Sequence, residues 1–352
     1  MTSRERVLAA ARRSKPDRTP CNFRAEEATL ARLYEHLGHR DYDRLLEQLN
    51  VDIRYIDCVA PKEKDCGEYI QNHWGERYVY RDTPWGRRVE HLPGALADAS
   101  SIEDFTGFGW PSVEMNDYTG ISELCRGYDD YAIVYGFGDV FTRPSIVRGF
   151  ENFLLDMYVN PEYVHFLINK FTDIFIEDYR RAFRESGDRI DIFLVMGDLA
   201  SQLGPIFSLE MFDSFLGPHI KRMAEAVHEM GALLMFHSCG ESIDFYGRLI
   251  GCGVDIIDPI QPTSDKMSPE NLNLSFKDSA CFHGGIDVQR ILPFGSPEEV
   301  RSEVRRYIDA FTDSGYICCS AHYMQHDTPP ENILALYDEV HRYRPAGRQS
   351  PL

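Results

Sequence analysis

The sequence lacks any apolar run of the roughly 18 residues that a membrane-spanning helix requires. Residues 1–15 are rich in charge and contain no apolar core of the kind that a secretory signal needs. A basic excess is also missing, since 37 Lys and Arg residues stand against 56 Asp and Glu residues, a formal net charge of −19. Such a charge repels phosphate backbones and anionic lipids. We therefore expect a cytoplasmic protein that binds neither nucleic acid nor membranes.

Several familiar site motifs are absent as well. The sequence contains no Cys-x-x-Cys pair, no P-loop, no Gly-x-Ser-x-Gly and no His-Glu-x-x-His. Its nine cysteines are odd in number and scattered, unlike the paired framework of a small secreted protein, so we expect reduced thiols. Hydrophobic residues at 43% and charged residues at 26% are typical of a globular protein with a large core.

The sequence does contain short apolar runs that alternate with longer amphipathic segments, most clearly after residue 131. This alternation predicts βα units and a parallel sheet. Helices are indicated after Ser208, running to about residue 230, after Ser296, and from near Pro330, because Ser and Pro favour helix starts. The predicted strands are residues 51–56, 132–135, 190–195, 232–236, 254–257, 280–282 and 316–318.

The length of 352 residues suits one α/β barrel. We therefore predict a single (β/α)8 TIM-barrel domain over residues 1–352. Residues 66–95 depart from this alternation of apolar and amphipathic segments, because aromatic residues and glycines alternate there with polar residues. This segment predicts a small antiparallel insertion, a hairpin, which would serve as a lid or an edge cover.

His237 and Cys239 close the apolar run 232–236. In a strand, side chains two positions apart point to the same face, so this imidazole and this thiol would converge. Imidazole nitrogen and thiolate sulfur are preferred zinc ligands, and a catalytic zinc needs three protein ligands and one open position. The alternative is a buried strand with a polar tip and a packing cysteine. The spacing alone leaves both interpretations open.

Other polar side chains follow the expected strands, at the end of a barrel where active sites are built. Cys319 and His322 compete as the third metal ligand. Cys281 and His283 repeat the same-face spacing, and we interpret them as a structural pair. Further candidates could orient a substrate or move a proton, or could equally support or cap neighbouring groups: Asp198 and Gln202 as catalytic residues, and Asp139, Asp258, Gln261 and Tyr323 as substrate-binding residues.

Five short motifs are spread over nearly the whole chain: Arg4-Glu5-Arg6-Val7, Pro16-Asp17-Arg18-Thr19-Pro20, His237-Ser238-Cys239-Gly240, Gly284-Gly285-Ile286-Asp287 and Thr328-Pro329-Pro330-Glu331-Asn332-Ile333. Together they resemble the uroporphyrinogen decarboxylase superfamily, a group of TIM barrels that also holds zinc-dependent methyltransferases acting between corrinoid proteins and thiols. The decarboxylases carry Arg-Gln-Ala-Gly-Arg after the first Thr-Pro or Val-Pro, whereas this chain has Asn22-Phe23-Arg24-Ala25-Glu26. The resemblance is therefore closer to the methyltransferase branch.

The resemblance implies a zinc site formed by His237, Cys239 and His322, with Cys319 as the alternative third ligand. The methyltransferases have cysteine where this chain has His322, and the decarboxylases have histidine there. The implied activity is transfer of a methyl or other alkyl group to a thiol or similar nucleophile that the zinc activates.

The methyl donor would be corrinoid-bound or an onium compound. No Asp-x-His-x-x-Gly sequence is present to bind a corrinoid, so cobalamin would arrive on a partner protein. Likeness to other barrels of the superfamily also suggests a homodimer. Two alternatives remain: a decarboxylase or lyase that acts on a small carboxylate without a metal, and a non-catalytic protein that binds a corrinoid or another small ligand.

Overall fold

The computed structural model describes residues 1–83, 86–262 and 264–345. Its central element is a parallel sheet of seven strands in the order β1-β6-β7-β10-β11-β12-β13. All seven strands lie where the apolar runs predicted them. They are β1 (Ile53–Ile56), β6 (Ala132–Asp139), β7 (Ile192–Met196), β10 (Leu233–His237), β11 (Ile256–Ile260), β12 (Cys281–Ile286) and β13 (Gly315–Ser320).

The segment around Cys21 bridges the two edge strands of this sheet. Cys21 forms an isolated parallel bridge with Cys318 in β13. On the other side, its carbonyl accepts a hydrogen bond of 3.0 Å from the amide of Asp52, just before β1. The preceding Pro20 has no N–H to extend a ladder, so this segment stays too short to form a strand. In place of the expected closed barrel of eight strands, the described residues form an open parallel sheet of seven strands, and the Cys21 segment lies between its edges with a one-residue bridge to β13.

Near the amino-terminal ends of its strands, the interior of the sheet is apolar. Helix α1 (Ser3–Ala11) closes this end of the sheet. Val7, Ala10 and Ala11 of α1 pack against inward-pointing strand residues, among them Ile53, Val134, Leu194, Met235, Ile256, Cys281 and Ile317. Burying each large apolar side chain stabilises the fold by about 1.5–3 kcal/mol. Because side chains alternate along a strand, the positions two residues further on also point inward, at the carboxyl ends where polar groups gather.

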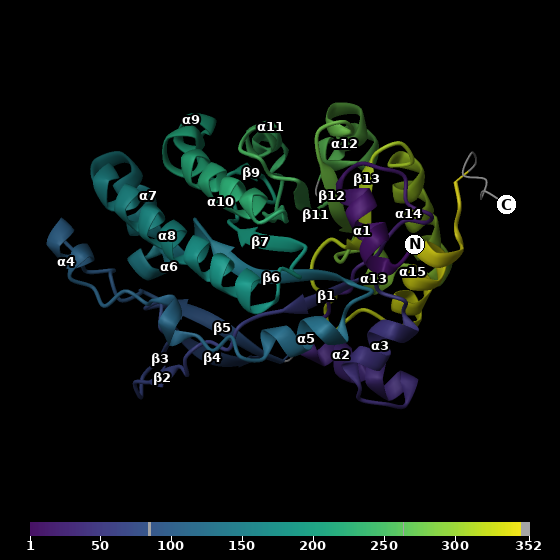
Figure 1. Cartoon of the computed structure of the whole chain (residues 1–352), viewed down its shortest axis with the longest axis horizontal. Coiled ribbons are helices and arrows are strands. Elements are labelled where there is room, and N and C mark those ends of the chain that lie inside the picture. Colours follow the sequence, from purple (N-terminus) through teal and green to yellow (C-terminus); the bar gives the residue numbers. More distant parts are fainter. Residues whose placement is uncertain (84–85, 263, 346–352) are drawn as a thin grey trace.

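Helices surround the outside of the sheet (Figure 1). The long helix α8 packs on β6, α10 packs on β10, and α14 contacts β12 and β13. Their bounds are α2 (Glu27–Leu37), α3 (Tyr42–Gln48), α4 (Ile102–Thr106), α5 (Ile121–Gly127), α6 (Thr142–Arg148), α7 (Phe150–Val159), α8 (Pro161–Glu185), α9 (Leu209–Met211), α10 (Gly217–Glu229), α11 (Ile243–Gly251), α12 (Pro269–Phe276), α13 (Ile291–Phe294), α14 (Pro297–Ala310) and α15 (Pro330–Arg342).

The predicted helix starts are confirmed. The Ser208 hydroxyl accepts from the amide of Met211, and helical turns continue through a π-helical stretch (Phe212–Leu216) to the end of α10. Ser296 and Glu299 form a reciprocal capping box at α14. Among the described residues, no helix is both long and apolar enough to cross a membrane.

The antiparallel insertion is a four-stranded sheet, β2-β3-β4-β5, where a hairpin was expected. Its strands are β2 (Lys64–Asp65), β3 (Ile70–Gln71), β4 (Arg77–Thr83) and β5 (Gly86–Leu92); positions 84 and 85 of the predicted insertion lie outside the described residues. Trp74, between β3 and β4, stacks on Phe171 and Phe175 of α8, with ring centroids 5.2 and 4.9 Å apart. This buried indole ties the insertion to the helical layer.

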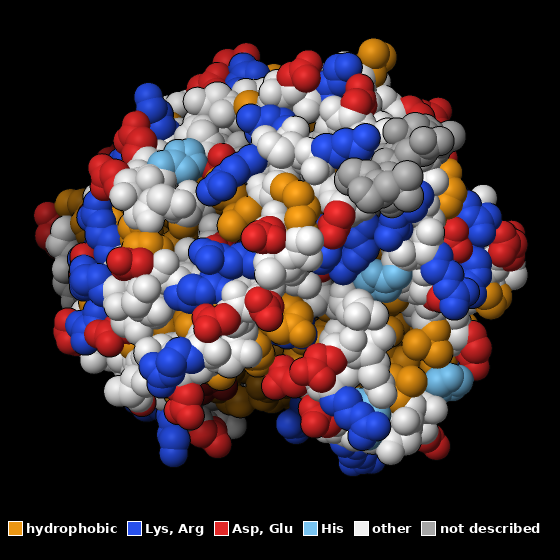
Figure 2. All heavy atoms as spheres, turned by 45° about the vertical axis from the view of Figure 1, so that its right-hand side comes forward, with side chains coloured by type: hydrophobic (Ala, Val, Ile, Leu, Met, Phe, Trp, Pro, Cys, Tyr) orange, Lys and Arg blue, Asp and Glu red, His pale blue; other side chains and the backbone are white. Residues whose placement is uncertain are grey.

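Charges of both signs alternate over the face that carries α14 and α15 (Figure 2). Apolar side chains appear on this face only in small groups between them.

Candidate metal centre

His237 and Cys239 converge at the carboxyl end of β10, as their spacing predicted. The imidazole Nε2 of His237 lies 3.4 Å from the Sγ of Cys239. A tetrahedral zinc bound to nitrogen at about 2.05 Å and to sulfur at about 2.3 Å separates the two atoms by about 3.6 Å. The observed separation is thus close to, and slightly shorter than, the one that a shared zinc ion would need. His237 is buried, and Cys239 is half-buried beside a pocket.

Asp198, which follows β7, joins this pair. Its Oδ1 accepts a 2.9 Å hydrogen bond from the amide of Cys239. The ligand atoms of Asp198, His237 and Cys239 all lie within 4.8 Å of one another. The sequence analysis gave Asp198 a catalytic role, and the structure places its carboxylate close enough to contact a metal or a metal-bound group.

The two predicted third ligands occupy different surroundings. His322 lines the same pocket as Cys239. Burial raises the pKa of the Cys239 thiol, but hydrogen bonds from His237 and His322 outweigh burial and lower it. Cys319 is fully buried, and burial raises the pKa of its thiol to about 11. Of the two, His322 is the side chain that contacts Cys239.

A buried carboxylate orients the His237 ring. Asp258, in β11, places Oδ2 2.6 Å from Nδ1 of His237 and Oδ1 2.5 Å from Nδ1 of His283. Arg24 donates from Nη1 to both oxygens, at 3.0 and 2.9 Å. Because Nδ1 of His237 is engaged, Nε2 is left to face Cys239. This is the arrangement in which a carboxylate fixes a metal-ligating histidine.

The charges of this cluster follow from its contacts. Burial raises the pKa of Asp258, but Arg24, His283 and His237 outweigh burial and hold it well below its usual value. Burial lowers the pKa of His237, whereas Asp258 and Cys239 raise it to about 10. Burial dominates at His283 and lowers its pKa. A raised pKa at His237 and a lowered one at Cys239 favour a proton shared between these two side chains, and a divalent cation would replace that proton.

Two residues of this network were missed by sequence reasoning. The hydroxyl of Tyr55, in β1, accepts from Nη2 of Arg24 at 2.8 Å and from Nδ2 of Asn22 at 2.8 Å. The same Asn22 amide lies 3.0 Å from Nε2 of His283. The one available signal for Tyr55 was positional, because it stands two residues after the inward-pointing Ile53. Asn22 comes from a loop that no strand pattern marks.

A pocket of about 460 Å³ opens over Cys239. It gathers the predicted Asp198, Gln202, Gln261 and His322, together with Ala200, Ser201, Gly240, Val288, Gln289 and Gln325. Its polar lining is mostly neutral amide, and Asp198 is the carboxylate among these residues. Such a lining suits a small substrate of low net charge.

Gly240 shapes the wall of this pocket. Its φ is +86°, and a Cβ at this position would meet the carbonyl oxygen of Ser201 at 2.4 Å. Only glycine fits so close an approach with this backbone conformation. The approach lets the amide of Gly240 donate to Oε1 of Gln261 at 2.7 Å, which fixes that predicted residue beside Cys239.

Three predicted substrate contacts lie elsewhere or are already engaged. Asp258 is buried beneath His237, as described above. Asp139 ends β6, where its buried carboxylate accepts from the amide of Phe141 at 2.9 Å; burial raises its pKa to about 7. Tyr323 is exposed at 39%, with its ring 5.7 Å from that of His322. The substrate-binding roles of these three residues stay predictions.

A sequence model of the family described as Uroporphyrinogen decarboxylase (URO-D) matches residues 126–343. This range contains every candidate ligand of the metal centre. The segments that supply Asn22, Arg24 and Tyr55 lie before it.

Relatives from two groups of enzymes match the chain. It is 27% identical over 216 residues to the methylated-thiol–coenzyme M methyltransferase of Methanosarcina mazei, covering 61% of this chain and 54% of that protein. It is 26% identical over 196 residues to the uroporphyrinogen decarboxylase of Ruthia magnifica, covering 53% and 51%. The chain thus spans about half the length of each. A solved methyltransferase from Methanosarcina mazei shares the fold, with a TM-score of 0.70 over 97% of this chain and 98% of that one, at 16% identity.

Proposed function

The chain belongs to the uroporphyrinogen decarboxylase family, and we propose that it is a zinc-dependent methyltransferase that activates a thiol or a similar nucleophile. The observation that carries this proposal is the 3.4 Å approach of His237 Nε2 to Cys239 Sγ beneath an open pocket. The methyltransferase among its relatives is consistent with this activity.

The donor set fits zinc, because one imidazole nitrogen and one thiolate sulfur meet at the separation that a tetrahedral ion requires. Bound zinc would stabilise a substrate thiol as its thiolate at neutral pH. His237 and Cys239 would hold the ion, and Asp258 would keep the His237 ring turned toward it. Asp198, with its carboxylate near both ligands, is placed to accept the proton that a substrate thiol loses.

The third ligand in this proposal is His322. It lines the pocket and contacts the Cys239 thiol, whereas Cys319 lies deeper among buried groups. Asp198 is the competitor for this position, since its carboxylate is already within reach of both other ligands. Gln202 and Gln261 would orient the substrate from the pocket wall.

Decarboxylation of a polycarboxylate is the second candidate, supported by the decarboxylase among the relatives. The position of Arg24 argues against decarboxylation of such a substrate. This guanidinium, the one candidate in the 22–26 segment for holding substrate carboxylates, is buried and binds both oxygens of Asp258. The pocket lining contains no Lys or Arg among the described residues. A substrate with several carboxylates would find no free positive partner there.

The remaining parts of the proposal concern partners. A corrinoid protein would bring the methyl group to the pocket, or an onium compound would enter it directly. A homodimer and a cytoplasmic location complete the prediction from the sequence. If neither reaction is found, the remaining interpretation is a non-catalytic protein that binds a corrinoid or another small ligand.

Metal content tests the proposal first. After anaerobic purification, the parent protein should contain close to one zinc per chain, and Cys239→Ala should lose it. Cys66→Ala, which removes an exposed thiol, is the matched control and should keep its zinc. A metal-free parent with activity would exclude the proposed chemistry.

Demethylation of methylcobalamin tests the reaction itself. We expect the zinc-loaded protein to consume methylcobalamin with at least one thiol from a panel, and Cys239→Ala to be inactive. If no thiol reacts but zinc is present, an onium donor is the next substrate class to try with the same panel. Release of CO2 from a small carboxylate by the metal-free protein would favour the decarboxylase candidate instead.

A further inference from the structure

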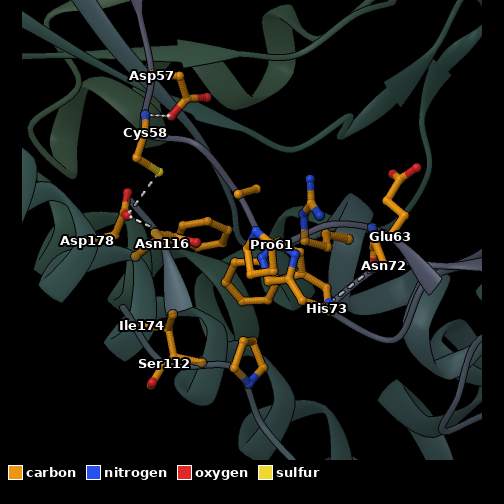
Figure 3. Close-up of a pocket in the computed structure, with 15 residues that line it drawn as sticks. Asp57, Cys58, Pro61, Glu63, Asn72, His73, Ser112, Asn116, Ile174 and Asp178 are labelled. Atoms are coloured by element: carbon orange, nitrogen blue, oxygen red, sulfur yellow. Dashed lines mark hydrogen bonds between the residues drawn. The ribbon is translucent and has the colours of Figure 1, made fainter. Parts of the chain in front are cut away.

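A second cavity, of about 260 Å³, lies between the loop after β1, the start of the antiparallel insertion and helix α8 (Figure 3). None of its lining residues lines the pocket over Cys239. The proposed reaction uses none of its side chains. The cavity has two chemically different sides.

One side presents hydrogen-bond acceptors and negative charge. Figure 3 shows Asp57, Cys58, Asn116 and Asp178 gathered there. Asp178 accepts from Tyr118 at 2.5 Å and from the Asn116 amide nitrogen at 3.2 Å. The Oδ1 of Asn116 is buried and has no hydrogen-bond partner among the described residues. A donor group on a ligand would satisfy this oxygen and would meet the Asp57 carboxylate.

The opposite side presents the donors of Arg143 and His73, beside the exposed carboxylate of Glu63. Arg143 lies with its guanidinium 5.4 Å over the Trp74 ring and donates from Nη1 to Glu76 at 3.1 Å. Its Nε is buried, and within the described part of the chain nothing accepts its proton. The Nδ1 of His73 is likewise buried and unpaired in that part of the chain. Burial and Arg143 lower the pKa of His73 to about 4, so the ring is neutral at pH 7 and free to donate from Nδ1.

Between the two sides the lining is largely apolar, from Pro61, Ile174 and Phe175. The volume has room for roughly nine water-sized groups of about 30 Å³ each. Buried donors and acceptors that lack partners are costly, so a ligand that pairs with both sides gains most. A simple ammonium ion would leave the Nε of Arg143 without an acceptor, and a simple carboxylate would be repelled by Asp57 and Asp178.

We propose that this cavity binds a small zwitterion of the ω-amino acid class, with its ammonium group at Asp57 and Asn116 and its carboxylate at Arg143 and His73. The methylene chain of such a ligand would lie along Pro61, Ile174 and Phe175. The site shares no lining residue with the pocket over Cys239.

Isothermal titration calorimetry with a chain-length series tests the proposal. The probes are glycine, 3-aminopropanoate, 4-aminobutanoate, 5-aminopentanoate and 6-aminohexanoate, with butylamine and butanoate as single-charge controls. We expect an optimum at one chain length, which measures the separation of the two sides. Both controls should bind about tenfold more weakly or worse, because each leaves one side unpaired. No binding by any amino acid, or butylamine binding as tightly as the best one, would overturn the proposal.

Variants locate the binding. Asp57→Asn should weaken the best amino acid about tenfold and should not weaken butanoate, which the Asp57 carboxylate repels. Asp278→Asn, which removes an exposed charge before β12, is the matched control and should bind as the parent does. Arg143→Lys, which keeps the charge but loses the Nε donor, should weaken the amino acid and spare butylamine. Unchanged affinity in Asp57→Asn, or loss of binding in Cys239→Ala, would place the ligand elsewhere and refute the assignment.

Discussion

Asp258 and His237, 21 positions apart in the chain, are joined by a 2.6 Å contact between Oδ2 and Nδ1 that decides which ring nitrogen faces the metal centre. The same carboxylate also binds Arg24 and His283, so it is fixed from three sides. The orientation of His237, a proposed metal ligand, thus depends on residues outside the proposed set of ligands.

Asp258→Asn should weaken zinc binding about 10- to 100-fold, the usual effect of losing a carboxylate behind a metal-ligating histidine. It should also lower the free energy of unfolding by about 3–5 kcal/mol, because Arg24 loses its buried partner. Competition with a chromophoric chelator measures the zinc affinity, and denaturant unfolding measures the stability. Zinc affinity equal to that of the parent in a folded variant would contradict the orienting role.

The third ligand can be identified by a set of matched variants. His322→Ala should lower zinc affinity about 100-fold or more, since it removes a direct ligand, whereas Cys319→Ser should keep its zinc. Asp198→Asn retains the oxygen that accepts from the Cys239 amide, so it should bind zinc but lose most methyl transfer. If Asp198→Asn loses zinc and His322→Ala retains it, the carboxylate is the ligand and His322 is not.

Alternation along strands accounts for what the sequence could predict. The apolar runs located all seven strands, and the spacing of His237 and Cys239 placed both side chains on one face. Tyr55, two positions beyond the apolar interior, follows the same rule as His283 and could have been found in the same way. This information is local, and it needs no knowledge of how the strands are arranged.

The partners of Asp258 could not be predicted in this way. Arg24 comes from a loop that lies beside β11 only after the sheet has curved and the segment around Cys21 has bridged its edges. Arg24 and Asp258 are 234 positions apart in the chain, so their contact depends on that curvature and no local sequence pattern indicates it. The second cavity has the same origin, because it joins the loop after β1, the insertion and α8. The parts of the site that could not be predicted are therefore those formed by contacts between distant segments of the chain.

Gly240→Ala should damage the metal centre without changing any ligand. Its Cβ would collide with the Ser201 carbonyl oxygen, and its φ of +86° disfavours any side chain. We expect a loss of about 1–3 kcal/mol in the free energy of unfolding and weaker zinc binding, because the turn that carries Cys239 must shift. Gly247→Ala, a helical glycine with open space around it, is the control and should be neutral or slightly stabilising. A stable Gly240→Ala variant with parent-like zinc affinity would contradict the close packing.

Asp139 should make the stability depend on pH. Burial raises its pKa to about 7 in the folded protein, against 3.8 for an ordinary aspartate. The folded state therefore binds this proton more tightly than the unfolded state. The contribution of Asp139 to the free energy of unfolding is most favourable below about pH 4. It is lost as the pH rises to about 7, and it falls by at most about 1.4 kcal/mol per pH unit.

Asp139→Asn removes this dependence while keeping an oxygen that can accept from the amide of Phe141. The free energy of unfolding of the variant, relative to the parent, should therefore rise steadily from pH 5 to pH 7.5 and then level off. Urea unfolding at half-unit pH steps measures it, with the exposed Asp278→Asn as the charge control. Parallel curves for parent and Asp139→Asn over this range would mean that Asp139 is ionised in the folded protein already at pH 5, and that the backbone amides and Arg143 outweigh its burial.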